Sequence, residues 1–141
     1  YMTLDVGSKF KMGPVWDFDR SSGNSDYWNQ QGAPDFLYKS KAGWFHLLFQ
    51  HKEARDILWE EWQAFYPKLA DLTERIEGWG DMLYRSQHWN FVKWDILDID
   101  VGANPKSVVR ANTYEKQLRL LTDYMASRAK ALNTFYKRQA R

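Results

Sequence analysis

Apolar residues recur at alternating steps of four and three through the middle of the chain, which is the spacing of one helical face. The sequence therefore predicts helix in this region, with the apolar face turned toward a core rather than toward a coiled-coil partner. Pro67 should split or kink the helix, because proline lacks the amide proton that an inner turn needs, and Gly78 and Gly80 should weaken its later part. The predicted face consists of Leu58, Trp62, Phe65, Leu69, Leu72, Ile76, Trp79 and Leu83.

Two further helical patterns flank this region. A short apolar run predicts a helix over about residues 43–49. A last helix should begin near Asn112 or Thr113, whose side chains can accept hydrogen bonds from its first amides. Arg128 falls on the apolar face of this last helix, where a long charged side chain usually reaches the surface or forms an ion pair. The residues expected on that face are Tyr114, Leu118, Leu121, Met125 and Leu132.

The N-terminal residues alternate with a shorter period. Phe10 and Met12 alternate with lysines, as in a half-buried strand, and with the first residues of the chain they predict a short β-hairpin. Gly, Ser, Asn and Pro then dominate a stretch that should form a loop. The prediction is a mainly α fold in a single domain over residues 1–141, with a hairpin and acidic motif (1–19), a loop (20–35) and a helical part (36–141).

The charge distribution argues against nucleic acid as a partner. The formal net charge of the chain is only +2, which provides no general attraction to phosphates. Residues 110–141 carry eight basic and two acidic groups, a net charge of +6. This cluster favours a solvated helix end, where cations suit the helix dipole, over a basic docking face.

The remaining composition removes several kinds of site. The chain has no cysteine, so disulfides, thiol catalysis and cysteine-based zinc sites are excluded in this segment. No apolar run is long enough for a membrane-spanning helix. The three histidines show neither an HExxH motif nor a spacing of four, so a zinc site is not expected.

Aromatic residues are abundant, with 8 Trp, 8 Tyr and 8 Phe. Exposed rings could bind sugars or peptides, whereas buried rings would fill a small helical core with large apolar area. Their helical spacing favours the core for most of them.

Three carboxylates, Asp95, Asp98 and Asp100, precede Gly102 and Pro105. A calcium-binding EF-hand loop is not supported, because the fifth position from Asp98 holds no oxygen ligand and the late glutamate is missing. We expect a polar loop here.

The most informative motif is Trp16-Asp17-Phe18-Asp19, which is followed by the turn-forming run Ser-Ser-Gly-Asn. Asp17 and Asp19 are two positions apart, so on an extended strand both side chains point to the same side. Mg²⁺ prefers oxygen ligands and usually takes one or two carboxylates together with substrate phosphates. Because Asp, Ser, Gly and Asn also form turns for purely local reasons, the motif indicates either a metal site or an acidic turn.

This Trp-Asp-x-Asp-x-x-x-Gly pattern resembles that of the spore-coat (CotH) kinase family, whose members are atypical, protein-kinase-like enzymes that phosphorylate secreted or surface proteins. The resemblance extends through the aromatic run Ile57–Trp62 and the late helix Asn112–Arg128. It implies a helical bundle that resembles part of a protein-kinase C-lobe, with Mg²⁺ (or Mn²⁺) and ATP as cofactors.

The resemblance also assigns roles to individual residues. Asp17 would be the principal metal ligand, and Asp19 would be a second ligand or would orient the first. Gly23 would let the backbone turn closely beside the nucleotide, and Asn24 would fix that turn through side-chain hydrogen bonds. In such a kinase the nucleotide-gripping lysine, the glycine-rich cover and the catalytic base lie upstream of residue 1.

We therefore expect the chain to be the C-terminal part of a longer kinase, since a two-lobed kinase needs roughly twice this length. The fragment alone should be inactive. The family further implies a protein substrate of surface or coat type and a setting outside the cytoplasm or at the cell surface. Two alternatives stay open: a non-catalytic, aromatic-rich helical module that binds protein or glycan, and a pseudokinase.

Overall fold

The computed structural model describes residues 2–14, 21–26 and 44–139. It confirms a mainly α chain with a short N-terminal hairpin, whose strands are antiparallel with Met2 opposite Met12. The elements in chain order are β1 (Met2–Thr3), β2 (Lys11–Met12), α1 (Trp44–Leu48), α2 (Lys52–Phe65), the 3-10 helix η3 (Tyr66–Leu69), α3 (Leu72–Lys93), α4 (Lys106–Arg110) and α5 (Tyr114–Gln139).

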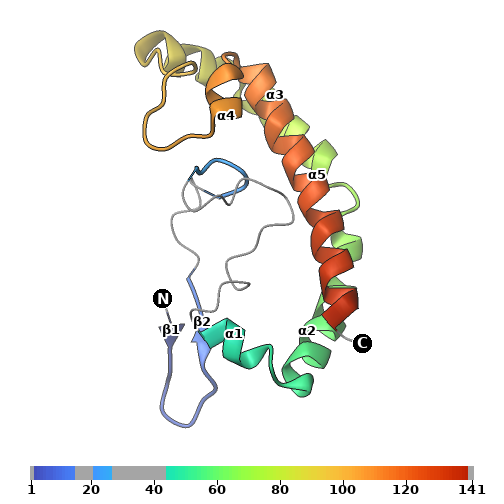
Figure 1. The fold of residues 1–141 in the computed structure, drawn as a ribbon. Helices are drawn as coiled ribbons and strands as arrows, with labels where there is room; N and C mark the ends of the chain where they lie inside the picture. The colour runs from blue at the N-terminus through green and yellow to red at the C-terminus, as the bar shows by residue number, and fades with distance from the viewer. Residues whose placement is uncertain (1, 15–20, 27–43, 140–141) are drawn as a thin grey trace.

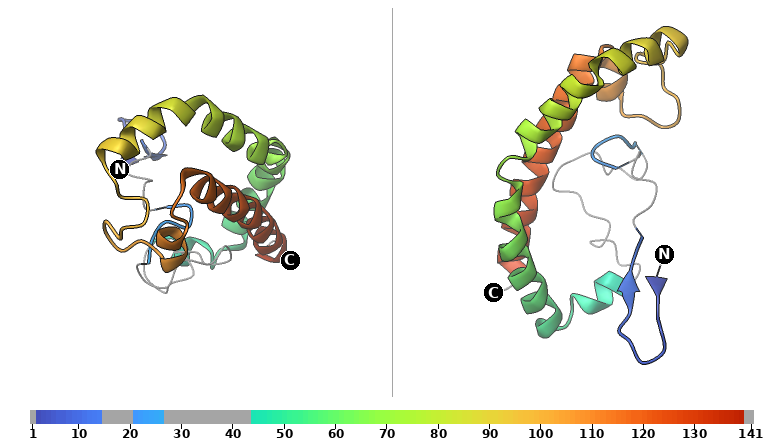
Figure 2. Two further views of the ribbon diagram at one scale, coloured as in Figure 1. Left: turned by 90° about the horizontal axis from the view of Figure 1, so that it is seen from above. Right: turned by 180° about the vertical axis from the view of Figure 1, so that it is seen from behind.

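Helices α3 and α5 form the main body of the molecule (Figure 1). They lie side by side, and α2 packs along the C-terminal part of α5, so that the three helices form a curved arc (Figure 2). The hairpin lies beyond α1 at one end of the arc, and α4 lies at the other end. Residues 21–26 lie on the inner side of the arc, near α4.

The helical run breaks at Pro67, as predicted. Helix α2 ends at Phe65, Pro67 lies in the first turn of η3, and α3 begins at Leu72. The break follows from the missing amide proton of proline. Helix α3 then continues without interruption through both glycines to Lys93, so that Trp89 and Phe91 lie within the helix.

A small core joins α2 to α5. Trp62 is only 8% exposed, and its ring centroid lies 5.5 Å from that of Tyr66 and 5.0 Å from that of Tyr136. Its indole Nε1 donates a 3.0 Å hydrogen bond to Asn133 Oδ1, which satisfies the one polar group of a buried indole. Ile76 of α3 is 6% exposed, and Pro105, which precedes α4, is fully buried.

The apolar face predicted for α2 and α3 is turned toward the core only in part. Trp62 and Ile76 are buried, but Phe65, Trp79 and Leu83 remain about half exposed. The expectation that most aromatic rings fill the core is wrong for α3, where Trp89 is 70% exposed. The physical reason is that a single layer of paired helices covers one side of each helix, and among the described residues no second layer packs on the other side.

Both ends of α5 are fixed by side chains. At its start, Thr113 Oγ1 accepts a hydrogen bond from the amide of Lys116 (3.3 Å), which confirms the predicted cap. At its end, Arg55 of α2 donates through Nε to the carbonyl of Gln139 (3.1 Å) and through Nη1 to that of Phe49 (2.8 Å). A cation suits the free carbonyls at a helix C-terminus, so Arg55 ties the connection between α1 and α2 to the end of α5.

The basic C-terminal part of α5 is solvated, as predicted. Lys130, Lys137 and Arg138 are all exposed. On the predicted inner face, Leu118, Met125 and Leu132 are half-buried, as is Arg128. Among the helices of the described ranges, none combines the length and the apolarity that crossing a membrane requires.

Candidate functional site

The residues that follow the acidic motif form a tight turn. The amide of Asn24 donates a 3.0 Å hydrogen bond to the carbonyl of Ser21, and the φ angles of Ser22 and Gly23 are 57° and 85°. Two successive positive φ values are typical of a type I′ turn, in which glycine is favoured because it has no Cβ. The close turn predicted at Gly23 is therefore present.

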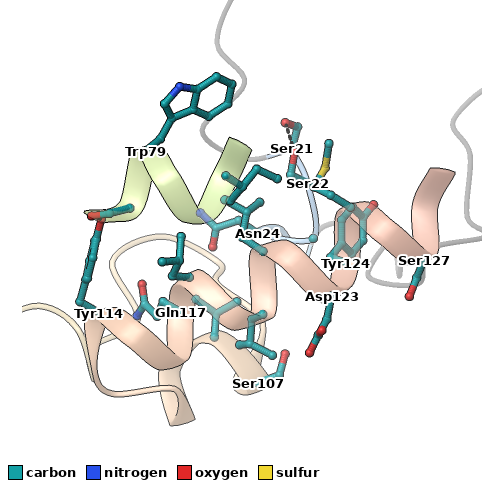
Figure 3. Close-up of a pocket in the computed structure, with 18 of the residues that line it drawn as sticks. Ser21, Ser22, Asn24, Trp79, Ser107, Tyr114, Gln117, Asp123, Tyr124 and Ser127 are labelled. Atoms are coloured by element: carbon teal, nitrogen blue, oxygen red, sulfur yellow. Dashed lines mark hydrogen bonds between the residues drawn. The ribbon is translucent and has the colours of Figure 1, made fainter. Parts of the chain in front are cut away.

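Gly23 packs against the ring of Tyr124 on α5. A Cβ at this position would lie 2.7 Å from Tyr124 Cδ2 and 3.0 Å from Cε2, which is closer than carbon atoms approach without a shift of one partner. Tyr124 lies beside Ser21 and Ser22 in the close-up of the site (Figure 3). The turn thus needs glycine here both for its backbone angle and for its contact with α5.

Asn24 connects the turn to a distant part of the chain. Its Oδ1 accepts a 2.9 Å hydrogen bond from Nδ2 of Asn104, 80 residues later. Beside it, the amide of Asp26 donates to the carbonyl of Ala103 at 2.8 Å. Two hydrogen bonds therefore join residues 21–26 to the loop that precedes α4.

That loop has a closely hydrogen-bonded conformation of its own. Asp100 Oδ1 accepts hydrogen bonds from the amides of Gly102 (3.0 Å) and Asn104 (2.9 Å). Asn104 Oδ1 accepts one from the amide of Val101 (3.0 Å), and the next residue, Pro105, is fully buried. Asn104 therefore uses its oxygen within the loop and its nitrogen toward Asn24.

A groove of about 910 Å³ lies between α3 and α5, next to the turn (Figure 3). Its lining is mainly apolar, with Asp123 as the one carboxylate and with no Lys, Arg or His among the described residues that line it. The described part of its lining therefore offers no cation that would neutralise a nucleoside triphosphate. Its apolar lining includes Leu72, Ile76, Trp79, Leu83, Phe91, Val108, Leu118, Leu120, Leu121 and Met125.

The two helices approach closely beside this groove. The hydroxyl of Tyr114 on α5 donates a 2.9 Å hydrogen bond to the carbonyl of Gly80 on α3. Burial, and to a smaller extent the charges of Asp81 and Glu115, raise the pKa of Tyr114 above its ordinary value. Tyr114 is therefore a neutral hydrogen-bond donor at physiological pH.

The predicted site residues divide into two groups. Gly23 and Asn24 form the turn described above, whereas Asp17 and Asp19 lie outside the described residues. The carboxylate of Asp100 holds backbone amides, in agreement with the predicted polar loop. Within residues 2–14, 21–26 and 44–139, no group of three His, Cys, Asp or Glu side chains lies close enough together to hold a metal ion.

Three residues of this arrangement were missed from the sequence: Asp100 and Asn104 as partners of the turn, and Tyr124 as the ring over Gly23. The run Asp100-Val-Gly-Ala-Asn104 is typical of turns in which short polar side chains bind nearby amides, so a compact loop was predictable. The contact between Asn104 and Asn24 has no local signal, because it depends on how the helices bring the two segments together.

One of the three sequence and structure comparisons found a match. The family model described as CotH kinase protein matches residues 1–132, a range that includes the acidic motif, the turn, the Asp100 loop and most of α5. Searches of curated proteins and of solved structures returned no match to the chain, so the expected likeness to a protein-kinase C-lobe stays a prediction. Since the match covers nearly the whole chain, the protein belongs to the CotH kinase family.

Proposed function

We propose that the chain carries the metal-binding element of an ATP-dependent protein kinase. The family match over residues 1–132 is the observation that supports this proposal. Asp17 would be the principal ligand of Mg²⁺ or Mn²⁺, and Asp19 would be a second ligand or would orient the first, since such ions prefer carboxylate oxygens. A bound Mg²⁺ or Mn²⁺ would supply positive charge to offset the negative charge that develops during phosphoryl transfer.

The described residues are compatible with this assignment. They contain no cluster of three acidic or histidine side chains that would compete for the ion, and the turn after Asp19 is held by Tyr124 and Asn104. The groove beside the turn has no cationic lining in the described ranges. From the family resemblance we further propose that the nucleotide-gripping lysine, the glycine-rich cover and the catalytic base are supplied from outside residues 1–141.

The substrate and the setting of the reaction follow from the family resemblance alone. We propose that the phosphate acceptor is a protein of surface or coat type, and that the reaction takes place outside the cytoplasm or at the cell surface.

The test is a calorimetric titration of MgATP into the full-length protein, with Asp17→Ala beside the wild type. We expect binding to weaken at least about tenfold in Asp17→Ala, which corresponds to about 1.4 kcal/mol. Asp95→Ala is the matched control, because Asp95 is also an aspartate but is exposed in the loop after α3. Equal affinities for wild type and Asp17→Ala would remove Asp17 from the site.

The isolated chain provides a second test. Since the cationic and basic parts of the site are proposed to lie outside it, residues 1–141 alone should transfer no labelled phosphate from ATP. Mg²⁺-dependent transfer by this chain, abolished by Asp17→Ala, would refute that part of the proposal.

A second candidate is a non-catalytic module that binds a protein or a glycan. The exposure of Trp79 (53%) and Trp89 (70%) on α3 favours it, because exposed aromatic rings suit both kinds of partner. A pseudokinase, which keeps the fold and loses transfer, is the third. Failure of the wild-type full-length protein to bind MgATP would favour these two over the kinase.

A further inference from the structure

One side of α3 carries large apolar side chains that no described element covers. The side of the helix at Gly80 packs against Leu118 of α5. At about 100° per residue, Met82 and Trp89 fall on the opposite side, about 200° and about 180° away from Gly80. They are 77% and 70% exposed, so the packing of α3 on α5 leaves both side chains in solvent.

These residues belong to a stripe along the helix, the back face of α3, which consists of Gly78, Met82, Arg85, Trp89 and Val92. Its steps alternate four and three, which is the spacing with which one helix contacts a second helix along its length. At 1.5 Å per residue the stripe extends about 21 Å. All five residues are exposed, and no described atom outside the helix lies within 4 Å of a Cβ placed on Gly78. A partner can therefore approach closely at that end.

The middle of the back face holds a positive charge. Arg85 is exposed and makes no hydrogen bond or ion pair with any other described residue. Its guanidinium group can therefore bind a carboxylate through two parallel hydrogen bonds. Beside it, the ring of Trp89 is held by an edge contact with His88, whose ring centroid is 5.3 Å away. Protein interfaces are enriched in tryptophan, methionine and arginine, the three residue types at the centre of this face.

We propose that the back face of α3 binds an amphipathic helix of a separate polypeptide, which presents an apolar stripe with one Asp or Glu opposite Arg85. The charge of Arg85 favours this partner over a second copy of the chain. Arg85 is the midpoint of the face, so a twofold pair centred there would bring two guanidinium groups together. The inference names the surface and the partner for the second candidate function above, and it does not depend on the proposed metal site.

The experiment measures the binding of two labelled peptides to the full-length protein by fluorescence anisotropy. Each peptide has three heptads with leucine at the contact positions, except that the central contact position is Glu in one peptide and Lys in the other. We expect the Glu peptide to bind at least about tenfold more tightly, because opposite charges attract and like charges repel across an interface. Arg85→Glu should reverse this order, and Trp89→Ala should weaken binding of the Glu peptide about tenfold.

Two variants at other exposed positions are matched controls. Arg119→Glu makes the same charge reversal on α5, and Ile57→Ala removes an apolar side chain of α2 that is 62% exposed. Both variants should leave the affinities for the two peptides unchanged. If Arg119→Glu reversed the order of the peptides as Arg85→Glu does, binding would depend only on net charge, and the proposal would be overturned.

Equal affinities of the two peptides for the wild type, or no binding of either, would also overturn the proposal. Sedimentation and titration with a chitin hexasaccharide would then identify another occupant. A dimer of the full-length protein that Trp89→Ala dissociates would assign the face to a second copy, whereas sugar binding that Trp89→Ala abolishes would assign it to a glycan. The titration of MgATP tests the kinase function separately, because Arg85→Glu and Trp89→Ala should leave MgATP affinity unchanged.

Discussion

Gly80 lies in the middle of α3, where glycine lowers helix stability by about 1 kcal/mol relative to alanine. The sequence predicts a weak point there, but the structure assigns the residue another role. Gly80 is buried, and a Cβ on it would overlap the side chain of Leu118 on α5. Its absent side chain is what allows the two helices to approach, whereas Gly78, two residues earlier, is exposed.

This contrast predicts opposite effects for the same substitution. Gly80→Ala should lower the free energy of unfolding by about 1–3 kcal/mol, because Leu118 must move out of its contact. Gly78→Ala should raise it by about 0.5–1 kcal/mol, since no described atom outside its own helix lies within 4 Å of the added Cβ. Urea unfolding of the full-length protein, followed by circular dichroism, measures both. Stabilisation of equal size by the two variants would show that Leu118 yields without cost.

At the scale of elements, local patterns predicted most of what is present. The steps of four and three indicated α2 and α3, Pro67 indicated the break between them, and Thr113 indicated the start of α5. These signals act within about four residues along the chain, so they need no knowledge of the fold. Which side of each helix would be covered depends on its neighbours, and there the prediction failed for Trp79 and Leu83.

The link between α3 and α5 through Tyr114 leads to a prediction about pH. Tyr114→Phe should cost about 1 kcal/mol of stability at pH 7, because the hydrogen bond to the carbonyl of Gly80 is lost. The pKa of Tyr114 is raised in the folded protein, so its contribution is complete below about pH 10, the ordinary value. The contribution is lost as the pH rises through the folded pKa, where ionisation favours the unfolded chain.

The measurement is the difference in unfolding free energy between wild type and Tyr114→Phe from pH 7 to pH 11. The other tyrosines and the lysines titrate in both proteins, so the difference isolates Tyr114. We expect this difference to be constant up to about pH 10 and to shrink above it. A difference that does not change over the whole range would mean that Tyr114 ionises equally easily in the folded and unfolded chains.

At the scale of the whole molecule, the helices form one curved layer with a small core around Trp62 (Figure 1). Helix α3 carries Trp79, Met82 and Trp89, which are 53%, 77% and 70% exposed. The sequence could not distinguish buried from exposed tryptophans, because both kinds occur within helices. Whether a ring is buried depends on how many layers of helices pack together, and that number is a property of the assembled fold.

Two variants test whether Trp62 is buried and Trp89 is exposed. Trp62→Ala should cost about 3–5 kcal/mol of unfolding free energy, because it removes a buried ring and leaves Asn133 without its donor. Trp89→Ala should change it by less than about 0.5 kcal/mol, since the ring is largely in solvent. Chemical unfolding of the full-length protein measures both variants. A cost for Trp89→Ala close to that for Trp62→Ala would contradict the exposure of α3 and would mean that another part of the full-length protein covers it.

The sequence by itself indicated α1, α2, α3 and α5, the break at Pro67, the hairpin, the turn at Gly23 and the resemblance to the family. Each of these depends on residues close together in the chain, through backbone angles, missing amide protons, end caps or a compact set of residue types. Only the tertiary structure shows that Asn104 donates a hydrogen bond to Asn24, that Tyr124 packs on Gly23 and that Leu118 packs against Gly80. These contacts join residues from 38 to 101 positions apart, and helix packing, which no local pattern encodes, brings them together.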